Sequence, residues 1–311
     1  MPSAEEVVEN VHQHVHQHVH AVNPFMSRTS YPRRSLIAYR ILTPISLLLA
    51  LITSIYFTFA KPHSGKFSRH TIWGQNHHRR TPFRINSITV SIYWIFLYLF
   101  QAIYCWTLWS PHSHILTHSA NLASHFIFHN LLLFGFINLW CRSYFWSGEL
   151  LIILNFANLG IAYIRFPFKK GESRIITHTA VLAGPLSWTF VALFWDGAAM
   201  MHATGFGARL FANVMVWTWF LWGAFFLSAY KDYATGFSMS ILSAALGVSQ
   251  FIHHIIALQW IFAFTIMAVL FLASAGVAGW DLRAMGRKIV DPEAQSSGET
   301  APLLRDGGAE A

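Results

Sequence analysis

Long apolar runs alternate with short polar segments along most of the chain. Eight runs of 19 to 23 residues hold almost no charged side chains. A helix needs about 20 apolar residues to cross roughly 30 Å of hydrocarbon, so each run predicts a membrane-spanning helix. The predicted spans are residues 41–60, 88–109, 120–141, 145–164, 176–195, 210–230, 234–252 and 255–277.

The pattern predicts an all-α fold, a polytopic bundle of about eight transmembrane helices over residues 41–280. Only His253 and His254 separate the last two runs, so a bundle of seven spans is the alternative. A polar N-terminal tail with a His-rich segment is expected over residues 1–40. The polar composition of residues 281–311 predicts a disordered C-terminal tail.

Composition and charge agree with a membrane protein. The chain is 54% hydrophobic and 11% charged, whereas soluble domains carry about 25% charged residues. With eight spans, 13 Lys and Arg residues fall on the side of the two tails and 8 on the other side. Cytosolic segments carry the excess of Lys and Arg, so both tails are predicted to be cytosolic.

The net charge of +8 lies at helix ends and loops, where it would meet lipid headgroups. The predicted partner is therefore the lipid bilayer, and no nucleic acid is expected. Residues 61–87 are the exception to the charge rule, with six Lys or Arg and four His on the non-cytosolic side. This loop is expected to bind polyanions or anionic headgroups there.

Two groups of histidines are candidate metal ligands. Residues four apart on a helix share a face, which would bring His12, His16 and His20 of the N-terminal tail together. A second set shares one face of the third span and comprises His118, His125 and His129. Imidazole suits zinc and copper. The alternatives are a low-complexity tail and neutral imidazoles that hydrogen-bond between helices. Neither Cys105 nor Cys141 adds a metal motif, and no cofactor is predicted.

Several other polar residues near the predicted non-cytosolic face or inside the spans could form a polar cavity. Polar and ionisable residues in a membrane are functional candidates by default. The candidate set is Glu149, Asn155, Asn158, Asp196, His202, Arg209 and Asn213. The alternative is that Arg142 pairs with Glu149 and Arg209 with Asp196, while the amides hold helices together.

The sequence lacks the motifs of common hydrolases, such as a nucleophile elbow, HExxH or a glycine-rich phosphate loop. Ser124, His129 and Asp196 match the Ser, Asp and His of membrane hydrolases only loosely. The histidine pair that those enzymes carry at helical spacing is missing, because His253 and His254 are adjacent.

A sorting signal is predicted in the C-terminal tail. Glu299, Leu303 and Leu304 fit the acidic dileucine pattern of an acid, three residues and two leucines. Pro302 disfavours a helix just before the leucines, and a clathrin-type adaptor would read the segment in extended form.

Four runs of the sequence resemble a fungal family of multi-pass membrane proteins known only as a domain of unknown function. They are RTPFRINSITVSIYWI, SHFIFHNLLLFGFINLWCRSYFW, GPLSWTFVALFWDGAAM and ALGVSQFIHHIIALQWIFAFTIMAVLF, within residues 68–275. The resemblance implies an endomembrane protein, of the vacuole in particular. Some members carry an ATP synthase F0-like label, but this chain lacks the glycine-rich hairpin with one mid-span carboxylate that such a subunit needs.

The leading hypothesis is an integral membrane protein of fungal endomembranes that acts as a transporter or a membrane scaffold, not as an enzyme. The alternative is a membrane redox or hydrolytic enzyme that uses the histidines of the third span.

Overall fold

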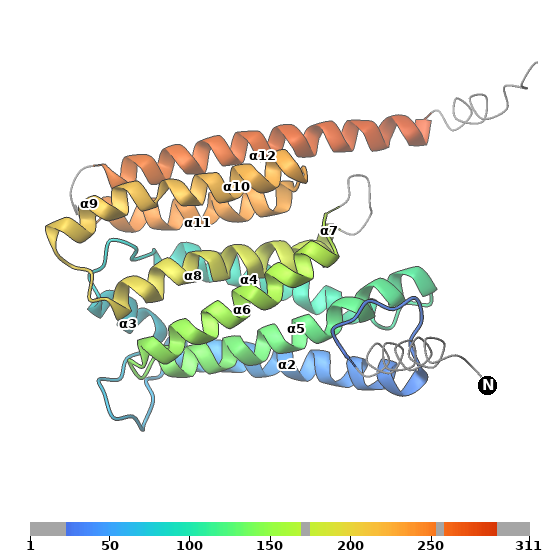
Figure 1. The fold of residues 1–311 in the computed structure, drawn as a ribbon, viewed down its shortest axis with the longest axis horizontal. Helices are drawn as coiled ribbons and strands as arrows, with labels where there is room; N and C mark the ends of the chain where they lie inside the picture. The colour runs from blue at the N-terminus through green and yellow to red at the C-terminus, as the bar shows by residue number, and fades with distance from the viewer. Residues whose placement is uncertain (1–22, 169–174, 253–257, 291–311) are drawn as a thin grey trace, which may run out of the picture.

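The computed structural model describes residues 23–168, 175–252 and 258–290, and over these residues it contains helices and no strand (Figure 1). The helices are α2 (Arg33–Phe59), α3 (Ile72–His78), α4 (Ser87–Thr107), α5 (Ser113–Trp140), α6 (Phe145–Arg165), α7 (Ile175–His178), η1 (Thr179–Ala183), α8 (Gly184–Met200), α9 (Phe206–Met215), α10 (Trp217–Ala229), α11 (Tyr233–Ile252) and α12 (Gln259–Val290).

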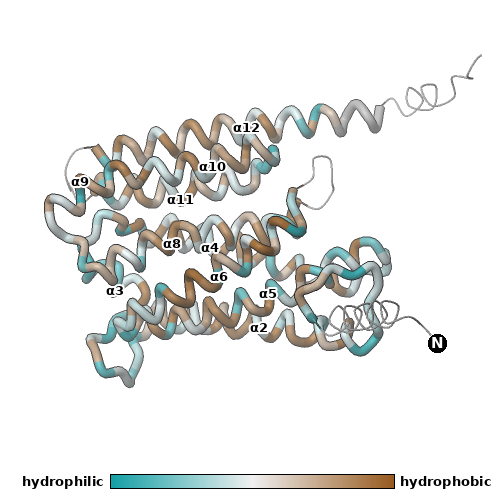
Figure 2. Tube along the Cα trace, viewed as in Figure 1, coloured by the Kyte–Doolittle hydropathy of each residue, from teal (hydrophilic) through white to brown (hydrophobic). Residues whose placement is uncertain are grey.

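Within the described part of the chain, eight helical segments are long and apolar enough to cross a membrane, which confirms the predicted polytopic bundle. The short helices α7 and η1 join α8 in one segment, Ile175–Met200, and α9 joins α10 in another, Phe206–Ala229. The last two segments, α11 and α12, are separate helices, so eight spans hold against the alternative of seven. Figure 2 shows hydrophobic positions along the helices and hydrophilic positions gathered toward their ends.

Helices extend past both predicted tail boundaries. Helix α2 begins at Arg33, inside the segment expected to be a polar tail, and α12 continues to Val290, ten residues past the expected limit at 280. A spanning helix can continue into the membrane interface through arginine positions, because the charged side-chain ends reach water while the backbone stays hydrogen-bonded. The predicted metal ligands His12, His16 and His20 and the predicted sorting signal Glu299, Leu303 and Leu304 lie outside the described residues.

The helices form two groups (Figure 1). Helices α10, α11 and α12 lie together along one side, and α2, α5 and α6 form the opposite side, with α4 and α8 between them. The start of α2 and the end of α12 lie at the same end of the bundle, as eight crossings require. We call it the tail end, and the other, which holds α3, the loop end.

The sequence Gly184-Pro185 produces a π-helical turn inside the fifth span. The N–H of Gly184 donates five residues back to the carbonyl of Thr179, and Pro185 has no N–H to continue the ladder. The carbonyl of Ala180 is five residues before Pro185, and Gln101 of α4 donates to it at 3.2 Å. A buried carbonyl freed by proline is thus satisfied by a side chain of the neighbouring helix.

The segment between α2 and α4 is folded onto the loop end of the bundle. Its residues 81–85 are buried, and Gln250 of α11 and Gln259 of α12 both donate to the carbonyl of Pro82, at 2.8 and 2.7 Å. Asn76 of α3 accepts a hydrogen bond from Trp195 of α8 at 2.9 Å. Much of the segment expected to be a loop is therefore a structured cap that joins α8, α11 and α12.

Candidate functional site

Helix α6 carries a row of four polar residues along its length, on more than one face, and each faces an ionisable residue from another element. In order from the loop end they are Glu149, Asn155, Asn158 and Tyr163. At 1.5 Å rise per residue the row extends about 21 Å along the helix axis, against roughly 30 Å of hydrocarbon. Because α6 packs between α5 and α8, its polar residues meet partners on both sides.

The first member of the row is a pair of carboxyl groups, Glu149 of α6 and Asp196 of α8. Each carboxyl group acts electrostatically on the other. Gly148 and Gly197 let the two helices approach here: a Cβ added to Gly148 would lie 3.3 Å from Asp196 Oδ2, and one added to Gly197 would lie 3.6 Å from Glu149 Oε1. Asp196 is 0% exposed.

Neither carboxyl group is neutralised by a described cation. Both oxygens of Asp196 and Oε2 of Glu149 are buried and accept no hydrogen bond from the described residues. Removing a carboxylate from water without a partner costs several kcal/mol, and two adjacent negative charges repel. This pair therefore calls for a proton or a cation between its oxygens.

The alternative in which arginines pair with these acids was wrong. Arg142 instead donates to the carbonyl of Ser64 and to Asn138, and its guanidinium lies over the ring of Phe57. No described ion pair joins Arg209 to Asp196, and the buried Nε of Arg209 has no hydrogen-bond partner among the described residues. Position at a span end therefore did not predict the contacts that Arg142 makes.

Further along α6, two amides bind two histidines of α5. Asn155 Oδ1 lies 3.1 Å from His129 Nδ1, and Asn158 Oδ1 lies 2.8 Å from His125 Nδ1. Asn158 also donates to the carbonyl of His125 at 3.0 Å. In both histidines the buried Nε2 has no partner among the described residues. Each imidazole is thus held by one nitrogen and leaves the other available to a proton.

The structure does not gather the third-span histidines around a metal. Among the described residues no group of three or more His, Cys, Asp or Glu side chains could hold a metal ion. The ring of His118 packs edge-on against Phe166, a contact that His125 and His129 do not share. His125 and His129 instead form hydrogen bonds between helices, as the alternative interpretation stated.

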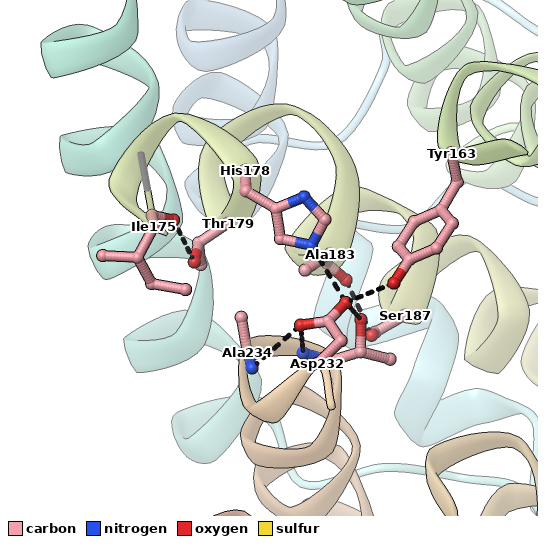
Figure 3. Close-up of polar contacts among 9 residues, drawn as sticks. Tyr163, Ile175, His178, Thr179, Ala183, Ser187, Asp232 and Ala234 are labelled. Carbon is pink, nitrogen blue, oxygen red and sulfur yellow. Dashed lines mark hydrogen bonds and ion pairs between the residues drawn. The ribbon is translucent and has the colours of Figure 1, made fainter. Parts of the chain in front are cut away.

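The last member of the row belongs to a buried cluster around Asp232, at the tail end (Figure 3). Asp232 Oδ2 accepts from Tyr163 of α6 at 2.8 Å and from Thr235 Oγ1 at 2.6 Å, and it pairs with His178 Nε2 of α7 at 2.9 Å. Asp232 Oδ1 accepts from the backbone N–H groups of Ala234 and Thr235, which caps the start of α11.

The Asp232 carboxylate is fully satisfied, unlike the pair at the loop end. Burial acts to raise the pKa of Asp232, but the charge of His178 and hydrogen bonds from His178 and Thr235 outweigh it and hold the pKa below its ordinary value. This cluster is a structural clamp of α6, α7 and α11. The sequence analysis missed it, although an Asp directly before an apolar helical run is a signal for a helix N-cap.

The residues of the predicted polar cavity differ in the contacts that the structure gives them. Glu149 and Asp196 come together, whereas Asn155 and Asn158 of α6 contact His129 and His125 of α5. His202 is exposed after the end of α8, where its Nδ1 lies 3.2 Å from the carbonyl of Met200. Arg209 and Asn213 lie on α9, and the buried Oδ1 of Asn213 has no hydrogen-bond partner among the described residues.

Comparison with known proteins confirms the resemblance to a fungal family. The family described as fungal protein of unknown function (DUF1774) matches residues 209–304, the C-terminal part of the expected range and its continuation. An uncharacterized protein of Schizosaccharomyces pombe is 24% identical over 269 residues, which cover 84% of this chain and 95% of the relative. No solved structure matches this chain.

Proposed function

We propose that this integral membrane protein is a transporter whose cycle is linked to binding and release of a proton at Glu149 and Asp196. The supporting observation is the buried carboxyl pair itself, in which Asp196 is 0% exposed and neither of its oxygens has a described partner. Chains of Asp, Glu and His inside a membrane are typical of proton relays in transporters. The scaffold and enzyme hypotheses assign no role to this pair.

A proton suits the pair better than a calcium ion. One proton shared between the two carboxyl groups removes the repulsion between two negative charges and leaves a single charge spread over both groups. Ca²⁺ takes about six to eight oxygen ligands, whereas two carboxyl groups supply four oxygens. The described residues add no third acid to them.

The row along α6 offers the proton further stations. Asn155 with His129 lies about 9 Å along the helix axis from Glu149, and Asn158 with His125 about 4.5 Å beyond. The free Nε2 atoms of both histidines are buried in the bundle. At 100° per residue, Asn155 and Asn158 lie about 120° and 180° around α6 from Glu149, so a proton would have to pass around the helix, which needs side-chain motion or water.

Proton exchange at the pair is tested by infrared spectroscopy of the full chain in liposomes. Between about pH 8 and about pH 5, the wild type should gain a protonated-carboxyl band that Asp196→Asn and Glu149→Gln each remove. Asp281→Asn, a carboxyl of α12 outside the row, is the control and should keep the band. A spectrum without any pair-dependent band over this range would contradict proton exchange.

The link to transport is tested with a pH-sensitive dye inside the liposomes. Outward gradients of monovalent cations, amino acids or phosphate are imposed one at a time across a pH step. One of these solute classes should drive proton movement through the wild type. At equal protein incorporation, the same gradient should drive no proton movement through Asp196→Asn. Proton-driven flux that survives in Asp196→Asn would remove the pair from the mechanism.

We further propose that the protein resides in the vacuolar or another endomembrane, where an acidic lumen would supply the proton. The support is the acidic dileucine pattern Glu299, Leu303 and Leu304, which an adaptor would read. Leu303→Ala with Leu304→Ala in a fluorescent fusion should move the protein to the plasma membrane or delay it in the Golgi. Unchanged vacuolar labelling in this variant would place the address elsewhere.

A further inference from the structure

A lateral cavity of about 550 Å³ lies between α2 and α4, with α5 and α8 as its floor and α3 at its loop end. Ser54 and Thr58 of α2 line one wall, and Trp94 and Tyr98 of α4 line the other. This volume is within the range of about 300–1,000 Å³ typical of small-molecule sites. We call this feature the α2–α4 groove.

The floor of the groove is aromatic and its rims face the membrane. Trp140 of α5 and Trp188 and Trp195 of α8 form the floor. On the rims, Ile55 of α2 and Leu99 of α4 are exposed on spanning helices, where lipid chains surround them. Among its polar side chains, Ser54 and Tyr98 have hydroxyl oxygens 2.7 Å apart and so partner each other. A groove with an aromatic floor and apolar rims that face lipid is suited to an acyl chain.

The loop end of the groove is next to four basic side chains. Phe59 and Ile72 line the groove there, and Lys61 and His70 are each two residues away from one of them. His70 stacks on His78 with ring centroids 4.6 Å apart. Arg79, whose guanidinium lies over the ring of Phe145, acts electrostatically on His70 together with Lys61. We call Lys61, His70, His78 and Arg79 the mouth cluster.

The mouth cluster has an excess of positive charge that its own segment cannot neutralise. Residues 60–86 contain no Asp or Glu. Burial, followed by the nearby His78, Arg79 and Lys61, lowers the pKa of His70. The buried Nε2 of His70 has no hydrogen-bond partner among the described residues. A negative group placed here would find unpaired donors and unopposed positive charge.

We propose that the α2–α4 groove binds one anionic phospholipid, with an acyl chain along the tryptophan floor and the headgroup phosphate on the mouth cluster. The membrane supplies the chain, and the basic side chains select the headgroup, since juxtamembrane Lys and Arg attract anionic lipids. The proposal is independent of the proton-linked cycle, because Glu149 and Asp196 do not line the groove.

The test uses tryptophan fluorescence of the full chain in mixed micelles, quenched by phospholipids with brominated acyl chains. Five of the 13 tryptophans line the groove, so an occupied groove produces strong quenching. Brominated phosphatidylserine should quench at about tenfold lower concentration than brominated phosphatidylcholine, because selectivity comes from the basic side chains. Equal quenching by the two lipids would overturn headgroup selection.

Two charge-matched double variants locate the selectivity. Lys61→Gln with Arg79→Gln, within the mouth cluster, should bring phosphatidylserine down to the level of phosphatidylcholine. Lys66→Gln with Arg80→Gln removes the same charge from exposed positions of the same segment and should keep most of the preference. Equal loss in the two variants would mean diffuse surface attraction instead of a site.

A groove-filling variant tests the acyl chain. Ser91→Phe adds a ring to the groove wall and should weaken quenching by both lipids. Ala102→Leu, a smaller filling of the same groove, serves if Ser91→Phe fails to fold by gel filtration and circular dichroism. Undiminished quenching in a folded groove-filling variant would overturn the proposal, as would full displacement of the lipid by inorganic phosphate alone.

Discussion

The tightest constraint at the level of single residues is the Asp232 carboxylate, which ties three parts of the chain together. Its two oxygens accept bonds from α6, from α7 and from the start of α11. Tyr163 and His178 reach Asp232 only in the folded bundle, whereas Thr235 lies in the first turn of the helix that follows it. The turn that holds Asp232 is therefore fixed from several sides.

Asp232→Asn should lower the free energy of unfolding by about 3–5 kcal/mol, the range for breaking a buried ion pair. Because the folded pKa of Asp232 lies below the ordinary value of about 3.9, its stabilisation is present above that ordinary value. It is lost as pH falls through the folded pKa. Thermal unfolding of wild type and variant in detergent should differ at neutral pH and converge in strong acid. Tyr163→Phe removes one hydrogen bond and should cost only about 1 kcal/mol.

The residue before Asp232 carries backbone strain. Lys231 is exposed and adopts φ 56°, the left-handed region, which costs a non-glycine residue about 1–2 kcal/mol. Lys231→Gly should raise the free energy of unfolding by up to about 1 kcal/mol, after the added freedom of the unfolded chain is counted, and the melting temperature should rise with it. Lys231→Ala keeps the strain and is the control. A Gly variant no more stable than the Ala variant would mean that φ is not the limiting feature.

At the level of elements, the π-helical turn η1 makes the fifth span depend on its neighbour α4. Tyr93 of α4 donates to the carbonyl of Gly184 at 2.8 Å, and Gln101 of the same helix donates to that of Ala180. The turn brings the two helices together at Gly184, where no side chain would fit. A Cβ there would lie 2.6 Å from Leu97 Cδ1 and 2.8 Å from the Thr179 carbonyl oxygen.

Gly184→Ala should therefore destabilise the bundle by about 1–3 kcal/mol, because the added methyl group overpacks a helix contact. Gly160→Ala is the matched control in another span: a Cβ at Gly160 meets nothing within 4 Å. It should gain about 0.5–1 kcal/mol from helix propensity. Melting temperatures in one detergent compare the two, and equal shifts in the same direction would contradict the close approach at Gly184.

On the scale of the whole molecule, eight crossings place the start of α2 and the end of α12 on one side of the membrane. The segment with the mouth cluster lies at the other end of the bundle. The groove headgroup site and the Asp232 clamp therefore face opposite leaflets.

Cysteine labelling in sealed vesicles tests this topology. In a chain without Cys105 and Cys141, we expect Ser113→Cys and Arg283→Cys to react with an impermeant maleimide from one side, and Ser64→Cys only from the other. These three positions are exposed at span ends or loops. Reaction of Ser113→Cys and Arg283→Cys from different sides would rule out eight spans, and the reactive side would test the cytosolic assignment of the tails.

The sequence by itself determined that this is an all-helical membrane bundle, because hydrocarbon demands long apolar runs whatever their neighbours are. It also singled out Glu149, inside an apolar run, and Asp196, at the end of one, since charge at such positions is rare. Their mutual contact could not be predicted: the two residues lie 47 positions apart, and the glycines beside them reveal nothing until α6 and α8 pack together.

Only the tertiary structure decided which polar groups are satisfied. His125 and His129 looked like metal ligands by spacing, but their partners Asn158 and Asn155 come from another helix. Arg142 looked like a counterion of Glu149 by proximity along the chain, yet it donates to Asn138. No described ion pair joins Arg209 to Asp196. The spacing of apolar residues indicates which positions face lipid, and it can be determined from the sequence of a single helix. Hydrogen bonding and charge pairing depend on the relative rotation and register of neighbouring helices, which only the assembled bundle defines.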